Sequence, residues 1–179
     1  AAKAFPVIDD EAGVSMQEAI AEARAEQDSV GGTIECVVDG LPAGLCAPNF
    51  GRNGEGIFSQ HLFAVPAEKA ETFGTGVAFS LMRGSEANDP IVKKGDKIST
   101  RTNNAGGLNG GITNGMPIVF EVTMWPTPSI GLPQETVDLS TGEETEVEIT
   151  GRHDPCIVHR AVPVIEAAAA LAACELLGI

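Results

Sequence analysis

Residues 160–177 read RAVPVIEAAAALAACELL, and this Ala-rich stretch decides the fold class. Alanine and leucine favour a helix, and Pro163 falls in its first turns, where a proline is best tolerated. Because the stretch is apolar on nearly every side, we expect a helix that is buried. A buried helix requires the segments before it to supply the surrounding layers.

The other expected elements lie in groups. The capping box Ser15–Glu18 predicts a helix over 16–28, and a second, more apolar helix is expected at 57–65. Alternating or β-branched patterns predict strands at 33–38, 77–83, 117–124 and 145–149. In the last of these strands, Glu146 and Glu148 are expected to face water, opposite Val147 and Ile149. Grouped strands and helices favour an α+β fold with antiparallel packing over a doubly wound parallel sheet.

Composition narrows the classes of function. The 179 residues include 25 acidic and 11 basic side chains, a net charge of −14. This length predicts a single domain over residues 1–179, and the acidic balance argues against nucleic acid or an anionic membrane as a partner. Cys36 and Cys174 sit in apolar runs and are interpreted as buried thiols of a reducing compartment. The cysteines and histidines form no zinc pattern, so no metal site is expected.

Two glycine pairs mark the segment TNNAGGLNGGITNG at residues 102–115. Glycine adopts the positive φ angles that a tight loop needs, and it leaves backbone N–H groups open to a ligand. The segment is therefore a candidate cradle for an anion or a flat ring. A set of purely structural turns is the competing interpretation. A short basic run, Lys93, Lys94 and Lys97, precedes it and is interpreted as a solvated turn.

Three ionisable residues stand together in GRHDPC at residues 151–156, just ahead of the Ala-rich helix. Arg152 offers a planar fork for phosphate or carboxylate, and Asp154 can accept a proton. The competing interpretation makes Asp154 a helix cap paired with Arg152. A third segment, WPTPS at residues 125–129, presents two hydroxyls on an extended backbone, which is also typical of an ordinary strand exit.

Together these segments resemble the chorismate synthase family. The resemblance rests on the three segments above and on DSVGG at 28–32, GLPAGL at 40–45, RGSEAND at 83–89 and RAVP at 160–163. It runs over essentially the whole sequence, and the Asn-Ala-Gly-Gly loop combined with GRHDPC is highly specific. The family's chain is much longer, and its N-terminal segments do not occur here. The sequence therefore resembles the C-terminal half of the family's chain, clipped slightly at its far end.

The resemblance implies both a fold and a reaction. The fold is part of a β-α-β sandwich, an antiparallel sheet with packed helices that makes up about half of the family fold. The reaction is a 1,4-elimination of phosphate from 5-enolpyruvylshikimate 3-phosphate, which gives chorismate in the shikimate pathway of aromatic amino acid biosynthesis. The family is a lyase and a flavoprotein that requires reduced FMN, although the reaction has no net redox change.

The resemblance also carries site residues onto this sequence. The expected cofactor contacts are Pro66, Ala67, Gly110, Trp125, Pro126, Thr127, Pro128, Ser129 and Arg152. Arg152 is also expected near the substrate, and Asp154 matches an aspartate near the flavin N5, a candidate for proton transfer. No metal ligand is implied. Trp125 stands where the family has Lys, so a charge-assisted contact is lost unless Lys93 or Arg101 replaces it.

The expected partners follow from the same resemblance. They are the missing N-terminal half of the same protein and further copies of the chain, since the intact enzyme is a homotetramer in the cytoplasm. The isolated chain is expected to be inactive, because the missing half carries most of the substrate-binding residues. The alternative function is a non-catalytic flavin-binding or interaction module built on the same half-fold.

Overall fold

The computed structural model describes residues 3–179 and has an α+β architecture, as predicted. The chain divides into two compact units. The first comprises the described residues up to Gly32 together with Met124–Val162, and the second comprises Thr33–Thr123 together with Pro163–Ile179. A single domain over residues 1–179 therefore stays a prediction.

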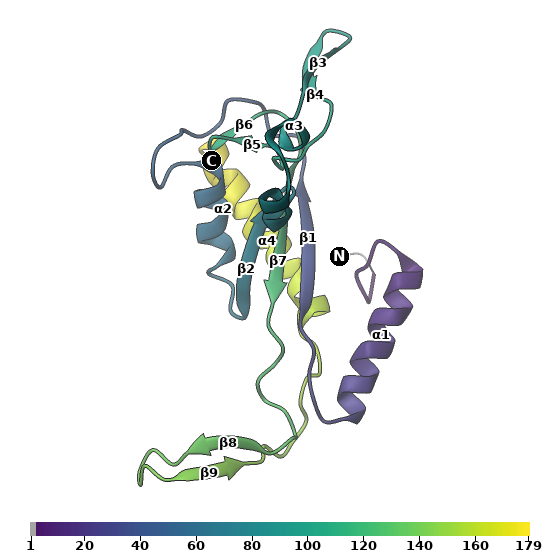
Figure 1. The fold of residues 1–179 in the computed structure, drawn as a ribbon, viewed down its shortest axis with the longest axis vertical. Coiled ribbons are helices and arrows are strands. Elements are labelled where there is room, and N and C mark those ends of the chain that lie inside the picture. Colours follow the sequence, from purple (N-terminus) through teal and green to yellow (C-terminus); the bar gives the residue numbers. More distant parts are fainter. Residues whose placement is uncertain (1–2) are drawn as a thin grey trace. The chain divides into compact units, whose positions relative to one another are not determined.

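The second unit is built on a three-stranded sheet of β1 (Gly32–Val38), β2 (Glu68–Phe73) and β7 (Ile118–Met124) in the order β1-β7-β2. The central strand β7 runs opposite to its two neighbours (Figure 1). Its sequence alternates strictly, so that Ile118, Phe120 and Val122 are fully buried on one face. The strands expected at 33–38 and 117–124 are thus confirmed.

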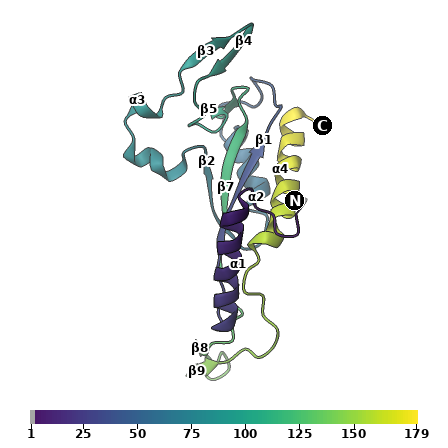
Figure 2. The same cartoon turned by 90° about the vertical axis from the view of Figure 1, so that its right-hand side faces the viewer.

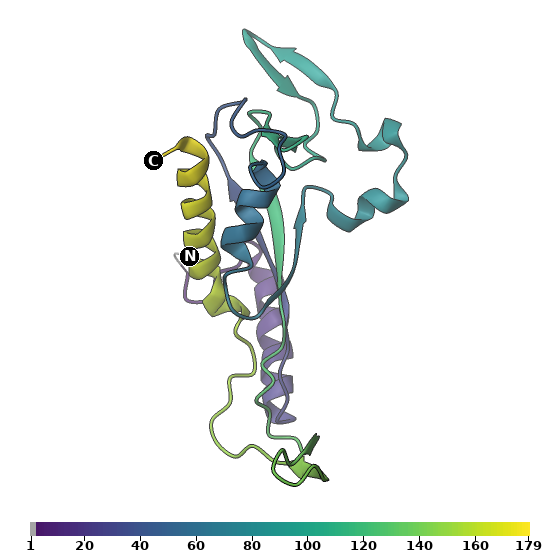
Figure 3. The same ribbon diagram turned by 90° about the vertical axis from the view of Figure 1, so that its left-hand side faces the viewer.

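Helices α2 (Gly54–Leu62) and α4 (Val158–Leu177) lie side by side against this sheet (Figure 3). Phe58 of α2 packs on Phe120 of β7, with ring centroids 5.6 Å apart. The two helices are tied where His61 Nε2 lies 2.8 Å from Glu175 Oε2. Helix α2 begins three residues before the expected 57–65, because the side chain of Asn53 caps it by accepting from Gly56 N–H.

The expected burial of the Ala-rich helix α4 is wrong for one of its faces. Ile165 and Ala172 are fully buried, whereas Val164 is 47% exposed and Leu171 is 61% exposed. A helix that is apolar all round needs partners on two sides, and the described residues cover only one. The prediction that Cys36 and Cys174 are buried thiols is wrong in part, since both are half-buried. The buried cysteine is Cys156.

Helix α1 (Asp10–Ala25) of the first unit begins six residues before the predicted 16–28. The carboxylate of Asp9 accepts from the N–H groups of Glu11 and Ala12, at 2.9 and 3.2 Å. Asp10 and Glu11 then place negative charge in the first turn, which the helix dipole favours. The expected capping box at Ser15–Glu18 therefore lies inside the helix, and that prediction is wrong.

The strand expected at 77–83 is also wrong. The sheet strand in this part of the chain is β2, which ends at Phe73, before the predicted segment. Residues Gly76–Leu81 form the short 3₁₀ helix η1. Gly74 and Gly76 have φ angles of +55° and +59°, which turn the chain out of the sheet. The helix α3 (Gly84–Ala87) follows, and then the hairpin of β3 (Ile91–Lys94) and β4 (Lys97–Thr100), which extends away from the sheet (Figure 2).

Two further hairpins complete the fold. The strands β5 (Leu108–Asn109) and β6 (Ile112–Thr113) belong to the second unit. The strands β8 (Gln134–Val137) and β9 (Glu144–Val147) belong to the first. The strand predicted at 145–149 is confirmed up to Val147, but all four residues of β9 are exposed, so the prediction that Val147 faces away from water is wrong. Among residues 3–179, no helix is long and apolar enough to cross a membrane.

Candidate functional site

The glycine-rich loop 102–115 is organised by the carboxylate of Asp89. It accepts from the Thr102 hydroxyl at 2.6 Å and from the N–H groups of Asn104 and Ala105 at 2.7 and 2.9 Å. Burial acts to raise the pKa of Asp89, but these hydrogen bonds hold it below its ordinary value. The loop is thus fixed from a neighbouring segment before any ligand is considered.

The two glycine pairs of this loop have different surroundings. A Cβ on Gly106 or Gly107 would collide with backbone atoms, and a Cβ on Gly111 would collide with Asn53. These three glycines therefore support the structural interpretation of the loop. Gly110, with a φ of +59°, has no neighbour within 4 Å of the same position. Gly110 is the glycine of the two pairs whose surface is open to a ligand.

Pro66 and Ala67 stand at the other end of α2 from Gly110. Gly54 N–H at the start of this helix donates to Gly111 O at 2.7 Å, whereas Pro66 follows the helix end. Nine helical residues span about 14 Å. Ala67 has a φ of +74°, a strained angle for a residue with a side chain. The structure does not bring these two sequence-predicted contacts together with Gly110.

In the first unit, the segment 125–129 is clamped by DSVGG. Ser29 Oγ donates to Thr127 O at 2.6 Å, and a Cβ on Gly31 would meet Met124 O and the Pro126 ring. The Thr127 hydroxyl is buried, and no described residue bonds it. A buried hydroxyl without a partner is uncommon, so Thr127 is a candidate ligand-binding group.

The segment GRHDPC lies on the other side of DSVGG, since Val30 N–H donates to Pro155 O at 2.8 Å. His153 Nε2 lies 2.8 Å from Ile149 O. The Asp154 carboxylate forms its ion pair with Arg160, and not with Arg152 as the competing interpretation proposed. Arg152 is left without an ion-pair partner in the described part of the chain.

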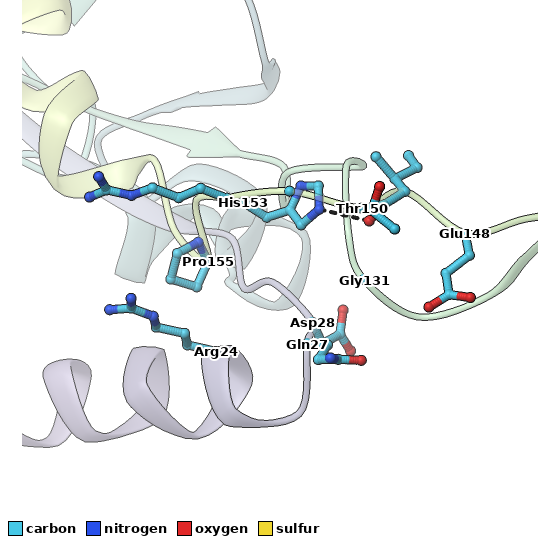
Figure 4. Close-up of a pocket in the computed structure, with 11 residues that line it drawn as sticks. Arg24, Gln27, Asp28, Gly131, Glu148, Thr150, His153 and Pro155 are labelled. Atoms are coloured by element: carbon cyan, nitrogen blue, oxygen red, sulfur yellow. Dashed lines mark hydrogen bonds between the residues drawn. The ribbon is translucent and has the colours of Figure 1, made fainter.

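A cavity of about 360 Å³ opens beside this segment (Figure 4). Figure 4 shows Arg24 at one end and Glu148 at the other. Residues from three segments line it: Arg24, Gln27, Asp28, Gly131, Glu148, Ile149, Thr150, Gly151, Arg152, His153 and Pro155. The cavity therefore joins Arg152 to a second guanidinium, that of Arg24, which sequence reasoning missed. The available signal was its place in the helix turn just before DSVGG.

The structure thus brings Trp125–Ser129, Arg152 and Asp154 into one unit, with Arg24 added. Pro66, Ala67 and Gly110 belong to the other unit. Within residues 3–179 there is no group of three or more His, Cys, Asp or Glu that could hold a metal ion. The first unit can offer an anionic ligand two guanidinium groups and an unbonded hydroxyl, and the negative charge of Asp154 is countered by Arg160.

Comparison with known proteins shows which family this chain is similar to. A family model described as chorismate synthase matches residues 1–177. A chorismate synthase from Thermococcus gammatolerans is 50% identical over 159 residues, which cover 89% of this chain and 44% of the relative. A chorismate synthase from Archaeoglobus fulgidus is 50% identical over 147 residues, which cover 82% and 41%. The chain spans under half the length of these relatives.

A solved structure agrees in fold. A crystal structure of chorismate synthase superposes on this chain with a TM-score of 0.72 at 28% sequence identity. The superposition covers 90% of this chain and 41% of the crystallised one. The similarity of fold therefore extends over about the same share of the longer chain as the similarity of sequence.

Proposed function

Because the chain belongs to the chorismate synthase family, we propose that it takes part in the elimination of phosphate from 5-enolpyruvylshikimate 3-phosphate to give chorismate. The observation that supports this most strongly is the family match over residues 1–177. The geometry adds that Arg152, the residue expected near flavin and substrate, is free of an acidic partner among the described residues. A free guanidinium is the group that an anionic substrate requires on a chain of net charge −14.

Reduced FMN fits the residues present. The unbonded hydroxyl of Thr127 can bond a polar edge of a flavin. Trp125–Ser129 and Arg152 of the first unit would hold the cofactor, while Gly110, Pro66 and Ala67 of the second unit stay contacts that the family membership alone implies. When bound, reduced FMN supplies transient electron density as phosphate leaves.

The chain's own residues act by charge and by proton position. Arg152 counters the negative charge that builds on the departing phosphate, in a cavity where a second guanidinium, Arg24, reinforces it. Asp154 holds or moves the proton at its Oδ1, because Oδ2 is engaged by Arg160. The only other contact at Oδ1 among the described residues is a long hydrogen bond of 3.4 Å from Cys156 N–H.

A complementary polypeptide is part of the proposal. The chain spans 44% of the length of the Thermococcus relative, and α4 leaves Val164 and Leu171 exposed on one apolar face. Exposed apolar faces of this kind mark interaction surfaces. We infer that the N-terminal half of the family's chain covers this face, that the complete enzyme is a homotetramer in the cytoplasm, and that the chain by itself is inactive.

The test is a chorismate assay under anaerobic conditions with reduced FMN. We expect no turnover from the 179-residue chain alone, and turnover once it is mixed with the N-terminal half of the Thermococcus relative. In that mixture, Asp154→Asn should lower turnover by about 10²–10⁴-fold, while Arg52→Gln, an exposed cation outside the cavity, should not. If the two Thermococcus halves recombine to an active enzyme and this chain never does, the proposed function is wrong.

A further inference from the structure

Besides the short β5–β6 hairpin, two hairpins of this chain have no partner strand among the described residues. The β3–β4 hairpin and the β8–β9 hairpin are each a two-stranded sheet. Every residue of β8 and β9 except Gln134 is exposed, and Ile91 and Ile98 of the β3–β4 hairpin are 77% and 79% exposed. Isolated hairpins are marginally stable in water, so both are suited to binding another surface.

The β3–β4 hairpin is basic. Lys94 and Lys97 face each other directly across the two strands, with Val92 opposite Ser99 on the same face. Lys93 adds a third positive charge, and Asp96 in the turn is the one acidic residue of the hairpin. Like charges placed directly opposite destabilise a strand pair. This hairpin therefore keeps an unfavourable pair that a negatively charged surface would relieve.

The β8–β9 hairpin carries the opposite charge in the same geometry. Glu135 and Glu146 face each other directly, and the next pair on that face is Val137 opposite Glu144. Side chains two apart in a strand share a face, so three carboxylates surround one exposed valine. The two hairpins are alike in form, each with one like-charge pair, but opposite in sign.

We propose that the β3–β4 hairpin of one copy of this chain binds the β8–β9 hairpin of a second copy. The Lys94–Lys97 pair meets the Glu135–Glu146 pair, so that each charge gains opposite neighbours, and the exposed Val137 is covered between them. A chain of net charge −14 repels its own copies in general, and a local contact of opposite charge such as this one opposes that repulsion. The proposal is independent of the reaction, because neither flavin nor substrate is involved.

Sedimentation velocity of the 179-residue chain without cofactor tests it. At about 0.02 M salt we expect self-association, and at about 0.5 M salt we expect dissociation, because exposed charges are screened within a few ångströms there. A chain that is monomeric at low salt up to about 100 μM would overturn the proposal.

Charge-reversal variants give the sharper test. K94E/K97E lowers the net charge by four and should weaken self-association at least about tenfold. E135K/E146K raises it by four, which reduces general repulsion, yet should weaken association equally, because it breaks the proposed contact. The variant with both reversals restores opposite signs and should associate again.

The matched control is K3E/R52E, which lowers the net charge by four outside both hairpins and should associate like the wild type. Tighter association of E135K/E146K would overturn the proposal, and so would association that ignores salt and is lost only in Leu171→Glu on the apolar face of α4. Retention of single-stranded RNA by the wild type, lost in K94E/K97E without any change in self-association, would instead assign the basic hairpin to nucleic acid.

Discussion

Asp89 and the pair Glu68 and Glu71 are carboxylates of the same unit, and the fold gives them opposite surroundings. Asp89 receives three hydrogen bonds, and its pKa is lowered. Glu68 is 6% exposed, and no described residue hydrogen-bonds the buried carboxylate oxygens of Glu68 or Glu71. Burial, together with the Glu71 charge, raises the pKa of Glu68 to about 7. One carboxylate organises a loop as an anion, and the pair tends to hold protons.

The comparison shows that the pKa of a buried carboxyl depends on the hydrogen-bond donors around it more than on how deeply it is buried. Burial also raises the pKa of Glu71 to about 7, against the weaker opposing influence of the nearby Ser59 hydroxyl. Asp89 is partly buried too, but backbone N–H groups reach it and favour its charged form. The loop that carries Gly110 is therefore stable at neutral pH, whereas β2 loses stability as the pH rises.

The largest expected effect is on the pH dependence of stability. The folded pKa values of Glu68 and Glu71, about 7, lie above the ordinary value of 4.5. The unfolded chain therefore releases protons first, so the free energy of unfolding falls as the pH rises from 4.5 to about 7 and levels off above that. The loss at about pH 8 is on the order of 2–3 kcal/mol for Glu68, and it is smaller for Glu71, which is half-buried and whose titration is coupled to that of Glu68.

The variant E68Q/E71Q should flatten this profile. A neutral amide of the same shape cannot ionise, so we expect its free energy of unfolding to exceed that of the wild type at about pH 8 and to match it near pH 4.5. Glu121→Gln, on the exposed position of β7, is the control and should leave the profile unchanged. Urea unfolding at several pH values measures all three, and a wild-type chain that is more stable at about pH 8 than at about pH 5 would contradict the expectation.

A smaller effect on stability is expected at Asp89, the carboxylate that receives three hydrogen bonds. Asp89→Asn removes the charge and part of the acceptor capacity for Thr102, Asn104 and Ala105, which should cost about 2 kcal/mol. The wild-type contribution is present above the ordinary value of 3.8 and is lost as the pH falls through the lowered folded pKa. Hydrogen exchange at residues 102–107 should speed up, whereas Asp96→Asn in the β3–β4 turn should leave it unchanged. Equal exchange in both variants would show that Asp89 does not hold the loop.

The same distinction explains what the sequence could predict. The strand β7 is predictable because its apolar residues alternate and the alternating face is buried. The strand β2 was missed because EKAETF carries two glutamates whose carboxylate oxygens are buried, and no sequence rule predicts an unbonded carboxylate there. The apolar stretch 77–83 has the pattern of a strand, although the positive φ angles of Gly74 and Gly76 turn the chain out of the sheet just before it.

The candidate site divides in a similar way. Sequence reasoning placed Arg152, Asp154 and Thr127 together, and the structure shows them in one unit. The competing interpretation paired Asp154 with Arg152, and it missed Arg160 because a partner six residues ahead depends on how the chain enters α4. Arg24 was missed because its position in the cavity follows from the turn between α1 and β1, which no local pattern specifies.

The smallest expected effect concerns that cavity, which is lined by charges of both signs. Arg24 lies at one end and Glu148 at the other, and Arg152 lines the same space (Figure 4). If the arginine end receives an oxyanion, Arg24→Gln should weaken binding of inorganic phosphate by about 3–10-fold, the scale of one exposed charge-assisted contact. Glu148→Gln should strengthen it slightly, because a distant negative charge is removed. NMR shifts of residues 150–153 during a phosphate titration measure both, with Arg52→Gln as the control for net charge. Changes of the same sign in Arg24→Gln and Glu148→Gln would show that the cavity does not distinguish its two ends, and phosphate binding would then have to be sought at Arg152 alone.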